Sequence, residues 1–358
     1  MSDYIAALRQ DLVEAAERER QHSPARRVAR PLLPRSWSPL ALLGTGAAVA
    51  GLLLLVVTLR AVSPPRTPEA PKVVGTYHLG SHPRDAAAAA GSLMIADYYG
   101  TVVRRSPASP QNPRQFKVRG QPTSIAADGD TIWVTTVAPL KDLNGSYLVQ
   151  LDARTGQRLA RVPLEGYASQ VAVGAGGVWF AADLHSGGLA RVDRRTRKRT
   201  AFVPKIAVEG LAVAGDSVWV RAGETVTQRD ERGQVVHHVK GISGTLGEES
   251  QRTLLADAQG AWVVGQLDGL LYRIEGGRVV QRVKLSETAG VIARSGSNLW
   301  VSAGPTDGRH EIVRVNAEDG KVTGRVSVGL HIPQAIVPIG KQLWVITSAG
   351  ELLRVSPE

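Results

Sequence analysis

The sequence predicts an all-β fold, a seven-bladed β-propeller with four-stranded blades, preceded by a single transmembrane helix. Three observations lead to this prediction. Tryptophan recurs about every 41 residues, which is the length of one propeller blade. An aliphatic residue stands eight positions before each of these tryptophans. Near the N-terminus, residues 39–59 form an uninterrupted run without charge.

The composition narrows the classes of function. The chain has 358 residues, more than one typical domain, and no cysteine, which excludes a disulfide scaffold, a cysteine-bound metal and a thiol nucleophile. The net charge of +11 is neither clustered nor interleaved with aromatic residues, so we expect no nucleic-acid partner. Arginine far outnumbers lysine, which is typical of GC-rich coding and indicates a bacterial source.

Residues 39–59 are predicted to span a membrane. At 1.5 Å per residue their helix is about 31 Å long, which matches a hydrocarbon core of ~30 Å. The alternative, a cleaved signal peptide, is less consistent with the 38 preceding residues and with the poor cleavage site at 60–63. Basic residues are more numerous before the span than after it, so we expect a cytoplasmic N-terminus and an extracytoplasmic propeller in the cell membrane.

The segments on either side of this span are short. Residues 1–38 are predicted to be a cytosolic tail with an amphipathic helix at 2–20, too short for a catalytic domain. Residues 60–71 are rich in proline, which favours an extended linker. The propeller is predicted to occupy 72–358.

The repeat defines seven blades. The aliphatic and tryptophan positions pair as Ile125 with Trp133, Val171 with Trp179, Leu211 with Trp219, Leu254 with Trp262, Ile292 with Trp300 and Ile336 with Trp344. A degenerate first copy has Ala86 and Met94 in these places. Each copy has room for four short strands, and a glycine or alanine four residues before the tryptophan position marks the first turn. We interpret the tryptophans as packing between neighbouring blades.

The two ends of the repeat region predict a closed ring. The last copy stops after 352–355 and lacks a fourth strand, whereas residues 72–80 form a surplus strand before the first copy. That surplus strand is similar to residues 321–329, a fourth strand of the preceding copy. We therefore expect the N-terminal strand to complete the last blade, which removes an open sheet edge.

Parts of the repeat resemble known propellers. Residues 170–180 (QVAVGAGGVWF), followed by 189–193 (LARVD), and residues 120–126 (GQPTSIA) resemble the repeats of the YVTN, NHL and virginiamycin B lyase-like families. The resemblance covers residues 72–358 and implies a propeller fold. These families include exported binding proteins, sensor domains of membrane kinases and a lyase that depends on magnesium, histidine and glutamate, so the resemblance implies no single function.

The predicted binding site is the mouth of the central channel. Propeller ligands usually meet the loops that lead into the innermost strands, so side chains just before each aligned aliphatic residue should face this mouth. The predicted partner is a protein or a polar cell-envelope ligand, and the alternative, a solvated polar rim without a partner, stays open. The candidate residues are Arg84, Asp85, Ser124, Gln170, Glu209, Arg252 and Gln334.

No catalytic residue, metal ligand or cofactor is predicted. His237 and His238 are neighbours on one strand and point to opposite faces, so they cannot hold one metal together. The chain lacks the usual hydrolase and nucleotide motifs. A metal-assisted lyase or hydrolase of the virginiamycin B lyase-like type remains the alternative. Its conceivable residues are Asp183, His185, Asp268, Asp307, His310 and Glu311.

One loop stands out by its length. The loop at 137–146 is longer than its equivalents and carries Leu140 and Leu143 among polar residues. It is interpreted either as a partner contact or as an insertion without a function.

Overall fold

The computed structural model describes residues 70–80, 82–137, 146–164, 167–183, 187–245, 252–305 and 308–357. The predicted tail, the predicted transmembrane segment and most of the linker lie outside these residues. The described part of the chain contains no helix that is long and apolar enough to cross a membrane. Membrane anchoring therefore stays a prediction.

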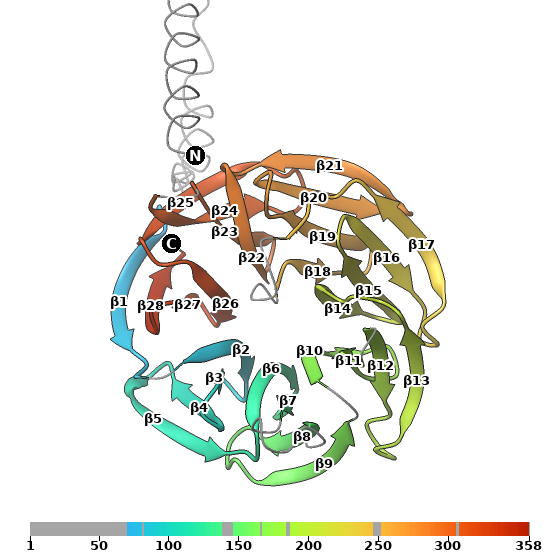
Figure 1. Ribbon diagram of the computed structural model, residues 1–358. Coiled ribbons are helices and arrows are strands. Elements are labelled where there is room, and N and C mark those ends of the chain that lie inside the picture. Colours follow the sequence, from blue (N-terminus) through green and yellow to red (C-terminus); the bar gives the residue numbers. More distant parts are fainter. Residues whose placement is uncertain are drawn as a thin grey trace, which may run out of the picture. The chain divides into compact units, whose positions relative to one another are not determined.

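The described strands form seven four-stranded antiparallel sheets around a common centre, which confirms the predicted seven-bladed propeller (Figure 1). In every blade the first strand lies nearest this centre. Blade 1 consists of β2 (Pro83–Ala89), β3 (Ser92–Asp97), β4 (Thr101–Ser106) and β5 (Ser109–Lys117). Blade 2 consists of β6 (Gln121–Asp128), β7 (Thr131–Val137), β8 (Ser146–Asp152) and β9 (Arg158–Leu164). Blade 3 consists of β10 (Tyr167–Gly174), β11 (Gly177–Asp183), β12 (Gly188–Val192) and β13 (Arg199–Pro204).

The remaining blades follow in chain order. Blade 4 consists of β14 (Gly210–Ala214), β15 (Ser217–Ala222), β16 (Thr225–Arg229) and β17 (Val235–Lys240). Blade 5 consists of β18 (Leu254–Ala256), β19 (Gly260–Gly265), β20 (Leu270–Glu275) and β21 (Arg278–Lys284). Blade 6 consists of β22 (Thr288–Ser295), β23 (Asn298–Gly304), β24 (His310–Asn316) and β25 (Val322–Gly329). Blade 7 consists of β26 (Pro333–Ile339), β27 (Gln342–Thr347), β28 (Glu351–Ser356) and β1 (Lys72–His78).

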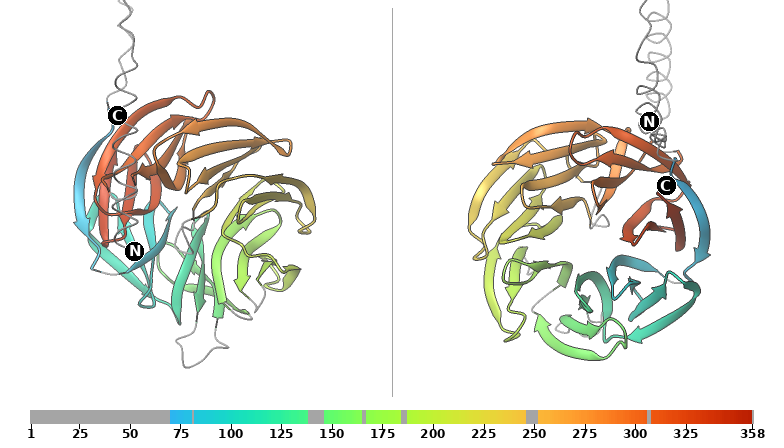
Figure 2. Two further views of the ribbon diagram at one scale, coloured as in Figure 1. Left: turned by 45° about the horizontal axis from the view of Figure 1, so that its top comes forward. Right: turned by 180° about the vertical axis from the view of Figure 1, so that it is seen from behind.

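The N-terminal strand closes the ring as predicted. β1 pairs antiparallel with β28, with Lys72 opposite Ser356 and His78 opposite Glu351. Figure 2 shows β1 in blue beside the red strands of blade 7. This pairing removes an exposed sheet edge from the last blade.

The ring has two different faces. The loops between the second and third strands of a blade, and those between one blade and the next, lie on one face, which we name the loop face. The turns between the first and second strands and between the third and fourth strands lie on the other, the turn face. Because β28 runs from the loop face to the turn face and β1 is antiparallel to it, Lys72 lies at the turn face.

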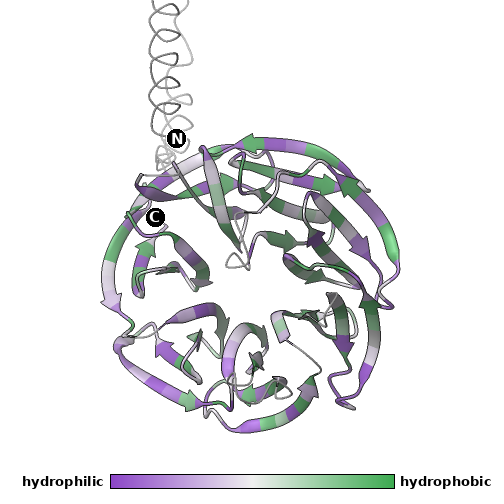
Figure 3. Ribbon diagram, viewed as in Figure 1, coloured by the Kyte–Doolittle hydropathy of each residue, from purple (hydrophilic) through white to green (hydrophobic). Residues whose placement is uncertain are grey.

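The hydrophobic core is divided among the joints between blades. The six tryptophans are fully buried, as is Met94 at the same repeat position of blade 1. Trp133 of blade 2 shares a cluster with Val171 of blade 3, and Met94 of blade 1 shares one with Ile125 of blade 2. Figure 3 shows hydrophobic residues along the inner strands, whereas outer strands such as β21 alternate between exposed and half-buried positions. The tryptophans therefore pack between blades, as predicted.

The first turns follow the predicted pattern with one exception. Ala90 and Ala175 have positive φ angles of 49° and 42°, in a region that usually favours glycine. Ala258, at the same repeat position in blade 5, is not in this region. There the Asp257 carboxylate accepts hydrogen bonds from the N–H groups of Gln259 and Gly260, both at 3.0 Å, and forms a different turn. Blade 5 therefore departs from the repeat on the turn face.

Candidate functional site

Asp85 is the centre of a hydrogen-bond network at the channel mouth. Its carboxylate accepts from the N–H of Ala86 at 2.8 Å, from the Ser124 hydroxyl at 2.8 Å and from the N–H of Ile125 at 3.0 Å. Asp85 lies in blade 1, whereas Ser124 and Ile125 lie in blade 2. This buried carboxylate therefore ties two blades together.

Arg252 completes this network from the far side of the ring. Its Nε donates to Asp85 Oδ1 at 2.6 Å, and its Nη2 donates to Asp85 Oδ2 at 3.3 Å and to the Ile125 carbonyl at 2.9 Å. Arg252 precedes β18 of blade 5, which blades 6 and 7 separate from blade 1. The side chain of Arg252 is 33% exposed and that of Asp85 only 3%. The pair therefore bridges the channel mouth and leaves Arg252 partly in solvent.

Two further predicted residues also join blades. The Ser124 hydroxyl accepts from the N–H of Val171 in blade 3 at 3.3 Å. The Gln170 amide donates to the Glu209 carbonyl at 2.8 Å, which links blade 3 to the segment that leads into blade 4. Asp85, Ser124 and Gln170 are buried, so their polar groups hold the ring together rather than face solvent.

Glu209 belongs to a separate cluster at the joint of blades 4 and 5. Its carboxylate accepts from the N–H of Gly223 at 3.0 Å and from the Thr245 hydroxyl at 3.1 Å. Next to it, the fully buried Arg221 donates to the carbonyls of Val264 and Ser243. Burial lowers the pKa of Arg221, while the charge of Glu209 opposes this shift. Sequence reasoning missed Arg221, because an arginine within a strand ordinarily indicates a solvent-exposed position.

A tyrosine lies in the same cluster. Tyr272 donates a hydrogen bond to the Asp268 carboxylate. Burial, together with this bond, raises the pKa of Tyr272 to about 12, so the phenol stays protonated at neutral pH. Asp268, a conceivable metal ligand from the sequence, is therefore already engaged as a hydrogen-bond acceptor.

The last two predicted residues lie in β-bulges. The ladder shifts register between Pro83 and Asp85, and again between Pro333 and Ala335, so Arg84 and Gln334 are extra residues in their strands. Arg84 is exposed, and its guanidinium lies 4.9 Å from the centre of the Tyr98 ring, which permits a cation–π contact. The side-chain oxygen atoms of Gln334 and Gln170 are buried, and neither has a hydrogen-bond partner among the described residues.

Hydrophobic side chains on the loop face are a feature that sequence reasoning did not identify. Among the described residues the four most exposed large hydrophobic residues all lie in loops of this face, and the next most exposed, Val236 at 52%, lies on an outer strand. The signal in the sequence is apolar residues inside short loops that are otherwise polar. The four residues are Tyr99 at 68%, Leu330 at 67%, Ile332 at 58% and Leu267 at 56% exposure.

The candidate metal ligands that the structure describes form no metal-binding cluster. Within the described ranges, no group of three or more histidine, aspartate or glutamate residues is placed to hold a metal ion. Glu311 pairs with Arg325, and burial lowers the pKa of the His310 imidazole. Several predicted positions lie outside the described residues. They are His185, Asp307, the side chain of Asp183, and Leu140 and Leu143 of the loop at 137–146.

Comparison with known proteins identifies the fold and no family. No family model matches the sequence, and no curated protein sequence matches it. Among solved structures, a chain from the crystal structure of the mitotic checkpoint complex aligns with a TM-score of 0.65 and 12% identity, over 92% of this chain and 98% of that one. A catalytically inactive variant of virginiamycin B lyase from Staphylococcus aureus, solved with quinupristin, aligns with a TM-score of 0.60 and 12% identity, over 79% of this chain and 98% of that one. Both similarities support the propeller fold.

Proposed function

We propose that this chain is a non-catalytic scaffold that binds a protein partner on the loop face of its propeller and is displayed outside the cytoplasm by a span at 39–59. The observation that carries the proposal is the concentration of the most exposed hydrophobic residues of the described chain on that one face. A soluble surface seldom gathers such side chains without an interaction to bury them.

The exposed residues near blades 7 and 1 resemble the centre of a protein interface. The rings of Tyr99 and His82 meet edge to face, with their centres 5.1 Å apart, and Tyr98 lies between Tyr99 and the guanidinium of Arg84. Tyrosine and arginine are enriched among residues that dominate binding energy. Leu330 and Ile332 precede the first strand of blade 7, the neighbour of blade 1. This part of the loop face therefore offers both aromatic and aliphatic anchors.

The hydrogen bonds at the channel mouth support the same proposal. Asp85 and Ser124 join the first strands of blades 1, 2 and 3, and Gln170 joins blade 3 to the segment before blade 4, which keeps the loops between them at fixed positions. A rigid platform loses less conformational entropy on binding than a mobile one. The similar propeller from the mitotic checkpoint complex, which was solved as part of an assembly, is consistent with a scaffold role.

The position of β1 bears on the proposed display. β1 begins at the turn face, so its first residue, Lys72, lies on the face opposite the proposed interface. Topology can be tested because the chain has no cysteine. A cysteine at Lys341, exposed on a turn, should react with an impermeant maleimide in intact cells, and one at Ser2 only after permeabilisation.

A polar envelope ligand at the channel mouth is the second candidate. It is favoured by buried oxygen atoms on Gln170, Gln334 and Thr253, none of which has a hydrogen-bond partner in the part of the chain that the structure describes. Such atoms are rare in folded proteins unless water or a ligand satisfies them. This candidate predicts binding that depends on these three residues rather than on the hydrophobic loops.

The test is cross-linked affinity purification of the full-length protein. A Tyr99→Ala, Leu330→Ala, Ile332→Ala variant should lose a partner that the wild type retains. The matched control is Val235→Ala, Val236→Ala, which removes similarly exposed side chains from the outer strand β17. Retention of every specific partner by the triple variant would contradict the proposed interface.

A further inference from the structure

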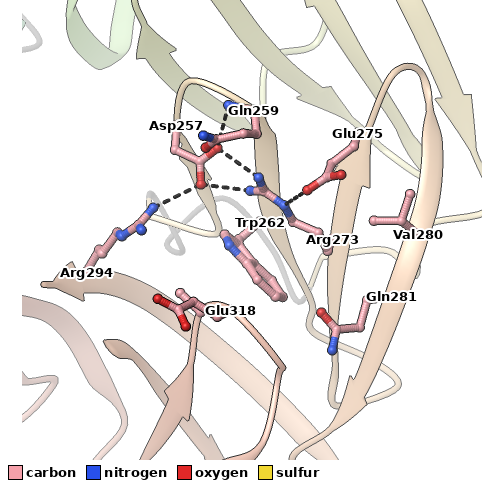
Figure 4. A pocket seen from close by; sticks show the side chains of 10 residues that line it. Asp257, Gln259, Trp262, Arg273, Glu275, Val280, Gln281, Arg294 and Glu318 are labelled. Atoms are coloured by element: carbon pink, nitrogen blue, oxygen red, sulfur yellow. Dashed lines mark hydrogen bonds and ion pairs between the residues drawn. The ribbon is translucent and has the colours of Figure 1, made fainter. Parts of the chain in front are cut away.

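The joint between blades 5 and 6 contains a pocket on the turn face, away from the channel mouth. Its volume is about 600 Å³, within the usual range for small-molecule sites. Figure 4 shows the side chains around it, with the indole of Trp262 at the centre of the wall. The lining residues are Asp257, Gln259, Trp262, Arg273, Glu275, Val280, Gln281, Arg294, Ala317 and Glu318.

The pocket is open because Arg273 binds carboxylates of its own blade and does not extend to the next one. In blades 1, 3 and 6 the third strand has an arginine opposite the tryptophan position, and this arginine extends to the next blade. Blades 2 and 4 have glutamine there. In blade 5 the equivalent Arg273 instead binds Asp257 with both terminal nitrogens, at 2.8 and 2.9 Å, and Glu275 with Nε at 2.9 Å. The contacts that cross elsewhere are Arg104 to the Arg154 carbonyl, Arg191 to the Glu231 carbonyl and Arg314 to the Pro357 carbonyl.

Asp257 fixes the wall of the pocket. It also accepts from Arg294 of blade 6 at 2.9 Å, so one carboxylate orients two guanidinium groups. Burial by itself would raise the pKa of Asp257, but the hydrogen bonds and charge of Arg273, together with the N–H groups of Gln259 and Gly260, outweigh burial and the pKa is lowered. The wall is therefore preorganised and charged at neutral pH, which reduces the entropy cost of binding.

Several polar groups in the pocket have unused hydrogen-bonding capacity. Arg294 uses Nε and Nη1, at Gly296 and Asp257, and no described residue engages its Nη2. Glu275 accepts through Oε1 only, and no described residue binds the Glu318 carboxylate. Gln281 donates to the Asp319 carbonyl at 2.8 Å and keeps its oxygen unused. Donors and acceptors are therefore both available to a ligand.

The charges of the residues that line the pocket restrict the chemical class of ligand that it can bind. A cation would be attracted to Glu275 and Glu318 but repelled by the guanidinium groups of the lining arginines. An anion would be attracted to those guanidinium groups but repelled by the carboxylates. A neutral ligand that donates and accepts satisfies both sets without repulsion. Vicinal hydroxyl groups suit the planar ends of arginine, glutamate and glutamine, and the half-exposed Val280 can contact C–H groups. We infer that this pocket binds a neutral polyhydroxylated ligand, a saccharide.

The test uses the full-length protein and a panel of neutral disaccharides built from glucose, galactose, mannose and N-acetylglucosamine. Saturation-transfer NMR should detect binding of at least one of them to the wild type. An Arg294→Ala, Glu318→Ala variant should bind that disaccharide at least tenfold more weakly. The control is Arg194→Ala, which removes the guanidinium paired with Asp128, the residue equivalent to Asp257 in blade 2.

Two results with the disaccharides would overturn the inference. One is the absence of saturation transfer from every disaccharide. The other is undiminished binding by the double variant with an unchanged melting temperature. Preferential binding of the charged probes putrescine or citrate would also contradict a neutral ligand. The site lies on the opposite face from the proposed protein interface, so the two proposals can fail separately.

Discussion

The bridge between Arg252 and Asp85 predicts that its two partners contribute unequally to stability. Truncation of Asp85 to alanine should cost far more free energy of unfolding than truncation of Arg252. The reason is burial, because Asp85 is 3% exposed and Arg252 33% exposed. Removing the buried partner leaves other buried groups without an acceptor, whereas removing the partly solvated partner does not.

The magnitude follows from the hydrogen bonds. Asp85→Ala deprives the N–H groups of Ala86 and Ile125 and the Ser124 hydroxyl of their acceptor. An unsatisfied buried donor costs about 1–3 kcal/mol, so the loss of an acceptor for three donors sets the cost of Asp85→Ala at about 3 kcal/mol or more. Arg252→Ala leaves those three donors on the carboxylate, so it should cost about 1–2 kcal/mol. The expected difference is roughly 2 kcal/mol.

Urea unfolding followed by tryptophan fluorescence measures this difference, because the tryptophans of the propeller are buried in its joints. The double variant should be no less stable than Asp85→Ala alone, since Arg252 has little left to bind once the carboxylate is gone. Equal costs for the two single variants, or a larger cost for Arg252→Ala, would refute the reasoning. Additive costs would show that Arg252 contributes mainly through other contacts.

Two further predictions test the turn face. Ala90→Gly should raise the free energy of unfolding by about 0.5–1 kcal/mol, because glycine adopts the positive φ of 49° without strain. Ala258→Gly should not raise it, because Ala258 does not have a positive φ. Chemical denaturation measures both values, and a gain at both positions would contradict the backbone explanation. The pKa of Asp257 is lower in the folded state than in the unfolded state, where it is about 4. The stabilisation that this carboxylate provides is therefore complete above about pH 4 and is lost as the pH falls through the pKa of the folded state. Urea midpoints of wild type and Asp257→Asn should therefore differ by a constant amount from pH 7 to about pH 5 and converge below about pH 4.

The fold was predictable because the residues that define it repeat. Each tryptophan position packs against the aliphatic position of the next blade, as Trp133 does with Val171, so one fixed spacing in the sequence describes every joint. The surplus strand at 72–80 likewise has a similar counterpart at the end of blade 6, which identified it as a fourth strand. Both signals are local in sequence, and a periodic fold converts them directly into architecture.

The site was predictable only in part, because its contacts join residues far apart in the chain. The sequence placed Asp85, Ser124 and Arg252 at the channel mouth, and the structure brings these three into one network. It gave no sign that the polar groups of Asp85 and Ser124 would be buried between blades. The sequence also did not predict the role of Asp257. Its carboxylate binds Arg273 within blade 5, and a pocket remains at the joint between blades 5 and 6.

Arg84 and Arg252 show why a repeat position does not determine a role. Both stand two residues before the aligned aliphatic residue of their blades, and both were predicted to face a partner. Arg84 is next to Asp85 in sequence, yet it lies in a bulge and its guanidinium contacts Tyr98 on the loop face. The carboxylate is thereby left to Arg252 from across the channel. Of these two arginines, Arg84, which contacts the half-buried Tyr98 beside the exposed Tyr99, is the better candidate for recognition, because no buried carboxylate neutralises its charge.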